Sequence, residues 1–279
     1  MLNLTLILIF SVTVFAQNLE FSIENNRGES FYSVKSDNTQ QLESKLIFPF
    51  NFNSFDVKYN HAFDNFILGL EYSFLLNSNS TKGEDYDWKE NLLTVFSYSS
   101  NEVNNYYKLG ANISSEIFKD LFLVGQFEYQ ELDFEWKDTY QEDYIKAKNL
   151  YVSGKNLQFK QIFYTYSIGL DKRYKLSNKI SLSLYSAFLY TFIEIKDKHI
   201  LRDFYTMQNA KTLGYHLGME LNYQINNDSY IITKVNSIKI EDKSVNMDYY
   251  NVLNEKYLSY PSMYSYENQK IKIGYKYIF

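Results

Sequence analysis

The sequence ends in IKIGYKYIF, residues 271–279, where apolar or aromatic side chains occupy every second position. On an extended backbone alternate side chains point to opposite faces, so this segment has one apolar face and one face that carries two lysines and a glycine. A membrane barrel turns its apolar face to lipid and its polar face to the lumen, whereas a soluble core has no need of inward lysines. We therefore predict a barrel strand with Lys272 and Lys276 pointing inward, and Tyr275, Tyr277 and Phe279 pointing outward.

The same alternation recurs along the chain, for example over 66–77 and 213–223. Short turn signals separate some of the segments, near 60–64, 118–120, 176–179 and 226–228. Longer polar connections separate the others, near 35–39, 77–88, 137–148, 196–204 and 241–256. Outer-membrane barrels have short periplasmic turns and long extracellular loops. Ten segments result, many about twice as long as an apolar band of ~25 Å requires. The sequence predicts an all-β fold, a ten-stranded antiparallel transmembrane β-barrel that projects beyond the outer membrane.

The chain opens with an apolar run over residues 4–15, which ends at Ala16. A run of about a dozen apolar residues before a small residue is typical of a secretory signal peptide, and it is shorter than the ~20 residues that span a bilayer. We predict a signal peptide over 1–16 and a single barrel domain over 17–279, located in the cell outer membrane.

The composition favours such a barrel and argues against several classes of function. The chain has 28 Tyr and 22 Phe but only 2 Pro, a combination that suits strands at a lipid–water boundary. It has no cysteine, which excludes disulfides and thiolate metal sites. The net charge of −5, without a basic stripe, argues against nucleic acid as a partner. We expect a monomer that uses no metal or other cofactor.

Two short constellations carry ionisable groups suited to hydrolysis: Asp85 with Asp87, and Asp197 with His199. Each pair is spaced i and i+2, so on a strand both side chains point to the same side. Each lies in or beside a long connection, which places it at the extracellular rim, although Gly83 is expected to interrupt the strand before Asp85. A carboxylate beside a histidine makes a tuned base, and a second carboxylate pair can hold a water for it. Three aspartates and a histidine around one water would hydrolyse a bond without a covalent intermediate.

These motifs, in this order and spacing, resemble the omptins, the ten-stranded outer-membrane proteases of Gram-negative bacteria. Short matches spread along the chain carry the resemblance: Asp85-x-Asp87-Trp88, Tyr129-Gln130-Glu131, Lys160-Gln161, Ile168-Gly169-Leu170 and Asp197-x-His199. The resemblance implies that the catalytic residues are Asp85, Asp87, Asp197 and His199. It also implies an acidic pocket for basic substrate residues, matched here by Glu29, and a lipid-binding site, matched by Tyr129 and Glu131.

The sequence departs from the omptin pattern at the lipid and substrate sites. Asp133 and Ile162 stand where the family has the two arginines of its lipopolysaccharide site. Phosphate recognition relies on bidentate guanidinium groups, and a carboxylate repels phosphate, which argues against a lipopolysaccharide requirement. The second acidic position of the substrate pocket falls on Ile195. Strand alternation also places Glu29 on the outward face unless Gly28 forms a bulge.

From the residues and the resemblance we predict an outer-membrane endopeptidase that cleaves extracellular polypeptides, with its active site facing the extracellular side. The acidic rim would attract cationic substrates. The alternative is a catalytically silent omptin-like barrel that acts as an adhesin or a structural outer-membrane protein. A small porin is a third reading, which is disfavoured because side chains fill a ten-stranded barrel. Of the other histidines, we expect His216 in a lumen hydrogen-bond network and His61 in a solvated turn.

Overall fold

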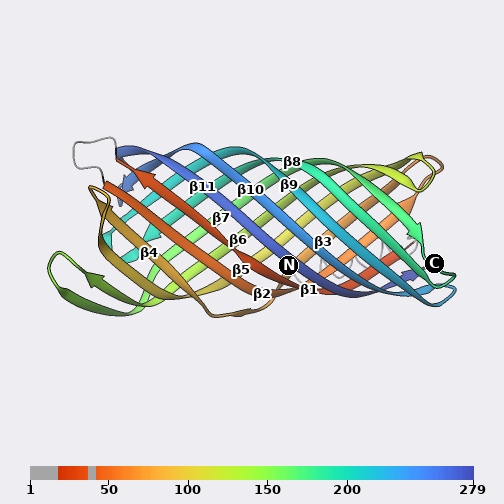
Figure 1. The fold of residues 1–279 in the computed structure, drawn as a ribbon, viewed down its shortest axis with the longest axis horizontal. Helices are drawn as coiled ribbons and strands as arrows, with labels where there is room; N and C mark the ends of the chain where they lie inside the picture. The colour runs from red at the N-terminus through yellow and green to blue at the C-terminus, as the bar shows by residue number, and fades with distance from the viewer. Residues whose placement is uncertain (1–17, 37–41) are drawn as a thin grey trace.

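The computed structural model describes residues 18–36 and 42–279, which form a barrel of antiparallel strands (Figure 1). The predicted signal peptide over 1–16 lies outside the described residues. The strands are β1 (Asn18–Lys35), β2 (Leu42–Ala62), β3 (Ile67–Asn79), β4 (Thr81–Lys89), β5 (Leu92–Phe118), β6 (Leu121–Asp143), β7 (Lys148–Lys175), β8 (Ile180–His199), β9 (Phe204–Asn226), β10 (Ser229–Asn251) and β11 (Lys256–Ile278). A short 3-10 helix, η1 (Ile200–Arg202), follows β8. Among the described residues, no helix is long and apolar enough to cross a membrane.

The strands of the described residues occupy ten places around the barrel, which confirms the predicted fold. β3 and β4 share one place, because both pair with β2 and with β5 and only Ser80 separates them. β1 closes the ring by pairing with both β2 and β11. Closure satisfies the backbone hydrogen-bonding groups that an open sheet would leave at its two edges.

The alternation at the C-terminus is also confirmed. Lys272 is 4% exposed inside the barrel, while Tyr275, Tyr277 and Phe279 are 42%, 38% and 60% exposed on its outside. Lys276 points inward as well and donates to Asn222 Oδ1 at 3.1 Å. The outer face carries exposed apolar side chains from many strands, among them Phe21, Leu70, Leu109, Ile168, Phe188, Leu213, Val235 and Ile271. An apolar belt of this kind is a surface that a lipid bilayer would cover.

The predicted long connections are mostly strand: the described tips between the strands at that end of the barrel are only 90–91, 144–147, 200–203 and 252–255. These hairpins are called the long loops below. Aromatic side chains fill the lumen toward them. Phe48 and Phe159 stack with their ring centroids 3.9 Å apart, and Trp136 lies 4.9 Å from Phe48. These rings belong to a buried cluster that also includes Phe50 and Phe134. The cluster packs the lumen beneath the mouth of the barrel, where the site described below lies.

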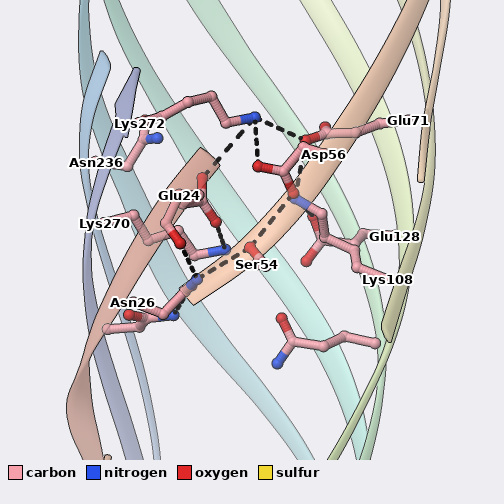
Figure 2. A network of polar contacts seen from close by, with 12 residues as sticks. Glu24, Asn26, Ser54, Asp56, Glu71, Lys108, Glu128, Asn236, Lys270 and Lys272 are labelled. Atoms are coloured by element: carbon pink, nitrogen blue, oxygen red, sulfur yellow. Dashed lines mark hydrogen bonds and ion pairs between the residues drawn. The ribbon is translucent and has the colours of Figure 1, made fainter. Parts of the chain in front are cut away.

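A network of ion pairs fills the lumen farther from the long loops (Figure 2). Lys272 of β11 extends between three carboxylates, with Nζ 3.1 Å from Glu71, 3.4 Å from Asp56 and 3.9 Å from Glu24. Lys108 of β5 also pairs with Glu71, at 3.0 Å. Because its members come from β1, β2, β3, β5 and β11, the network ties the first strand of the barrel to the last. A cavity of about 630 Å³ lies between this network and the short turns.

Candidate active site

Asp197 and His199 end β8 at the long-loop side of the barrel. Odd-numbered side chains of β8 face the lumen, where Ile193 and Ile195 are buried. Asp197 and His199 keep that phase, since the Asp197 side chain is fully buried and the His199 side chain is 17% exposed. The Asp197 Oδ2 and His199 Nε2 atoms are 3.3 Å apart. β8 ends here because the chain turns into η1 and then adopts a left-handed conformation at Asp203, with φ of 51°.

A tyrosine from the other end of the sequence joins this pair. Tyr32 of β1 donates a short hydrogen bond to Asp197 Oδ2, the oxygen that faces the histidine. Burial, together with the Asp197 carboxylate, raises the pKa of Tyr32 well above its ordinary value, so its hydroxyl keeps its proton and remains a donor. Tyr32 was not among the residues predicted from the sequence, because 165 residues separate it from Asp197 and only the closed barrel brings the two together. The sequence indicated only that Tyr32 points into the lumen, because it lies on the same face of β1 as Ser30 and Val34.

Aromatic rings hold the His199 imidazole in place. It stacks on Phe204, the first residue of β9, with ring centroids 4.3 Å apart and an interplanar angle of 20°. Phe204 packs in turn against Tyr249 of β10, at 5.9 Å. Asp197 therefore fixes one ring nitrogen while Phe204 fixes the plane of the ring, which leaves the second nitrogen a defined direction.

Asp85 and Asp87 lie on the lumen face of β4. Asp85 pairs in register with Leu46 of β2 and with Ser97 of β5, and both of these partners are buried. Asp87 pairs with Ser44 on the β2 side. The two aspartates therefore point into the barrel as the i, i+2 spacing predicted.

The strand leading to Asp85 differs from expectation at Gly83. Gly83 does not interrupt the strand; it lies inside β4 under the Trp136 indole, where a Cβ would approach to 2.4 Å. The irregularities come earlier, as a bulge at Leu76 in β3 and as the break at Ser80. Each irregularity reverses the alternation once, so the two cancel. Odd-numbered residues therefore face the lumen in β4, Asp85 among them, as they do in the first part of β3.

The two pairs act on one another electrostatically across the mouth. Burial, reinforced by the neighbouring Asp87 carboxylate, raises the pKa of Asp85 to about 7, against the opposing effect of His199 and Arg202. The Asp85 carboxyl is therefore partly protonated near neutral pH. Its Oδ1 atom, like Oδ1 of Asp197, is buried and has no hydrogen-bond partner among the described residues. Two such oxygens at one mouth with a histidine are suited to hold a water.

Replacing Asp85 by asparagine should change how stability depends on pH. The folded protein holds the Asp85 proton more tightly than the unfolded chain does, because its pKa rises from 3.8 to about 7 on folding. This stabilisation is complete below the unfolded pKa and is lost as pH rises through the folded one. Between about pH 4 and about pH 7 the wild type should therefore lose stability relative to Asp85→Asn. Chemical unfolding in detergent at several pH values measures this, and parallel profiles for the two proteins would contradict it.

Glu29 does not reach the mouth, which corrects the prediction of a substrate pocket around it. β1 pairs with β2 and with β11 without a bulge, so its odd-numbered residues stay on the outer face. Glu29 is exposed there, between Pro49 and Glu267 on the neighbouring strands. Ile195 is buried in the lumen at the second acidic position, and Glu194 beside it is exposed outside. Regular alternation thus keeps both acids out of the lumen.

Tyr129 and Glu131 lie on the outer face of β6 rather than at the mouth. Glu131 accepts hydrogen bonds from Tyr107 at 2.9 Å, from Tyr129 at 3.3 Å and from Lys160 at 2.5 Å. Lys160, on β7, also pairs in register with Asp133. The cation in this patch is therefore a lysine, which presents a point charge in place of the guanidinium fork.

The other two histidines lie away from the mouth. His216 faces the lumen, where its Nε2 is 3.1 Å from Asn236 Oδ1 and its ring meets the edge of Tyr185, as predicted. His61 packs against Phe63 beside the short turn after β2. In the part of the chain that the structure describes, no group of three or more His, Asp or Glu side chains is arranged to hold a metal ion.

Comparison with known proteins identifies the fold. No protein-family model matches the sequence. No curated protein matches it. Among solved structures, the outer membrane protease OmpT from Escherichia coli superposes with a TM-score of 0.84 and 16% identity, over 94% of this chain and 96% of OmpT. The translocator domain of the autotransporter NalP from Neisseria meningitidis has a TM-score of 0.44 and 9% identity, over 99% of this chain and 95% of the NalP domain. The outer membrane protein OprG from Pseudomonas aeruginosa has a TM-score of 0.41 and 10% identity, over 93% of this chain and 95% of OprG. The chain has the fold of OmpT, which confirms the resemblance to the omptins at the level of the fold.

Proposed function

We propose that this protein is an outer-membrane endopeptidase that hydrolyses extracellular polypeptides. The observation that carries the proposal is the close Asp197–His199 pair, with Oδ2 and Nε2 3.3 Å apart, at the same mouth as Asp85 and Asp87, whose charges act on it. The fold, shared with a protease, supports it. The apolar belt supports a location in the outer membrane, and long loops of barrels in that membrane face the outside.

In this mechanism Asp197 sets the tautomer of His199. With Nε2–H donating to Asp197 Oδ2, the Nδ1 atom is left free to accept a proton. A water held between Nδ1 and the Asp85 side loses a proton to His199 and attacks the peptide carbonyl. Protonated Asp85 donates to the developing oxyanion, and the neighbouring Asp87 carboxylate helps to keep that proton in place because its charge raises the pKa of Asp85. His199 then returns its proton to the leaving amine.

The substrates would be cationic segments of polypeptides. Asp85, Asp87 and Asp197 place three carboxyl groups at the mouth, and the field of such a cluster attracts cations. Such a field raises the association rate of basic peptides. Without a pocket at Glu29, the preference for a basic side chain beside the cleaved bond should be weak. We expect the protein to act as a monomer and without a cofactor.

Replacing Tyr32 by phenylalanine should lower kcat by about tenfold to a hundredfold and leave KM near the wild-type value. The change removes a buried, charge-assisted hydrogen bond to Asp197, a class worth about 1.5–3 kcal/mol, without changing the packing of the ring. Tyr106→Phe is the matched control, because Tyr106 is equally buried and its hydroxyl has no hydrogen-bond partner among the described residues. Steady-state kinetics on a basic peptide measures both, and an equal loss of kcat in the two variants would contradict the positioning role.

The proposal is tested by incubating the refolded barrel with a mixed peptide library, with and without lipopolysaccharide, and sequencing the products. We expect cleavage in both conditions, and the rates with and without lipopolysaccharide should agree within about twofold. The reason is that Asp133 and Ile162 stand in place of the two arginines that would bind phosphate. A strict dependence on lipopolysaccharide would overturn the expectation about lipid. No cleavage under either condition would favour the silent barrel, an adhesin or structural protein. Ion conductance across a planar bilayer would favour a porin.

A further inference from the structure

Two neighbouring strands end at different heights beside the catalytic histidine. β8 ends at His199, which pairs in register with Leu157 of β7. β7 continues beyond that pair as far as Lys148. Over residues 148–152 and at Lys155 it pairs with β6, with an irregularity between them, and no other described strand pairs with the opposite side of residues 148–156. An unpaired strand edge therefore begins where the proposed catalytic dyad ends.

Beyond the short helix η1, the surroundings leave this edge open for pairing. After His199 the chain turns through η1, which lies beside β7, and β9 then runs back alongside β8 from Phe204 onward. In Figure 1 the hairpin formed by the ends of β6 and β7 projects beyond the neighbouring loops. Leu150 and Tyr151 on β7 are 47% and 62% exposed. The segment contains no proline, so none of its backbone N–H groups is missing.

An exposed edge of this kind is a template for another extended chain. Natural sheets usually protect such edges with prolines, bulges or a covering loop, since unpaired N–H and C=O groups recruit foreign strands. Here Gly154, with φ of 84°, and Asp138, with φ of 55°, bend the hairpin at its base, and a hydrogen bond of 2.8 Å from Gly154 N to Asp138 fixes the bend. Beyond that bend, residues 148–152 form a regular pair with β6.

We propose that an extended segment of a polypeptide substrate adds to the free edge of β7 as an antiparallel strand, in line with β8, and so presents a peptide bond to His199. This inference rests on the proposed function and specifies how its substrate binds. Main-chain hydrogen bonds supply affinity in strand addition without requiring a particular sequence. A strand added there would lie about 4.8 Å from β7, the usual spacing of paired strands. It would continue the line of β8, which pairs with β7 from Leu157 onward.

The orientation of the added strand suits attack by a water in the lumen. In a sheet the peptide planes lie in the sheet, so the face of each carbonyl that a nucleophile approaches points to the lumen or to the outside. His199 and Asp197 lie on the lumen side, and a water held by them would meet the carbonyl along that direction. Alternate substrate side chains would point toward the acids of the mouth. Helical or tightly folded segments could not pair in this way, so the enzyme would select extended ones.

The first test is a scan of one cleaved basic peptide by N-methylation, position by position, away from the cleaved bond. Because alternate residues of a strand hydrogen-bond to the same neighbour, we expect KM to rise at every second position, by about threefold to tenfold for each lost bond. Intervening positions should change KM by less than about twofold. Cleavage that is indifferent to methylation would overturn strand addition and leave the proposed function intact. No cleavage of the unmethylated peptide by the wild type would overturn the proposed function, and this inference with it.

The second test follows amide hydrogen exchange in His199→Ala with and without a saturating amount of the same peptide. We expect slower exchange at alternate amides of residues 148–156. Amides of Gln141–Asp143 serve as the control in the same hairpin, because those residues pair with β5 and β7 already and should not change. Peptide binding that leaves the exchange of 148–156 unaltered would overturn the proposal.

Discussion

Replacing His199 by alanine should reduce peptide hydrolysis by about a hundredfold to ten-thousandfold, the usual contribution of a general base. His199 supplies the proton acceptor of the proposed mechanism, and Asp197, Tyr32 and Phe204 hold it in one orientation. Asp197→Asn should also cost heavily, because an amide at that position favours the other tautomer while preserving the shape. Initial rates on a basic peptide measure all of these effects.

The control for this experiment is His216→Ala, which should keep most of the activity. His216 lies in the lumen among Asn236 and Tyr185, away from the mouth. Comparable turnover by the wild type and His199→Ala would refute the mechanism. A parallel loss in both variants would point to general damage to the barrel, which the unfolding midpoints of the two variants would reveal.

Replacing Lys272 by methionine should destabilise the barrel by about 3–5 kcal/mol, the range found when one partner of a buried ion pair is removed. Methionine retains much of the chain volume but leaves Glu24, Asp56 and Glu71 with fewer cations around them (Figure 2). These acids belong to the first three strands and Lys272 to the last, so the loss falls at the closure of the barrel. The free energy of unfolding in detergent, obtained from denaturant titration, measures the effect.

Lys276→Met offers a matched comparison on the same strand and the same face. Lys276 donates to the neutral side chain of Asn222 and lies near the ring of Tyr230. Its charge also acts on the Glu220 carboxylate, which pairs with Lys234 as well. Removal of Lys276 therefore leaves that acid with a cation beside it, and we expect a loss below about 1.5 kcal/mol, the net value of an ordinary hydrogen bond. Equal losses in the two variants would show that the ion network contributes nothing beyond a single lysine contact.

Much of the barrel could be predicted because strand alternation is a local property. Each side chain is assigned to a face by its neighbours two positions away, which is why Lys272, Tyr275 and the strand count were read correctly. The pairs Asp85 with Asp87 and Asp197 with His199 were found for the same reason, since members of each pair are two residues apart. The same rule places the Glu29 side chain on the outer face of β1. The substrate pocket at Glu29 was predicted from the resemblance to the omptins, and the structure has no such pocket there.

Local patterns in the sequence therefore suffice to predict the architecture, the inward or outward direction of the side chains on each strand, and the candidate acid and base residues. Which strands face one another across the lumen follows from the closed barrel and not from any local pattern. This arrangement brings Tyr32 to Asp197, and it brings Lys272 to Asp56 and Glu71. It also left β7 longer than β8 beside His199. The physical reason is that contacts across a closed barrel depend on the register and length of every strand between them, whereas the phase of a side chain depends only on its own strand.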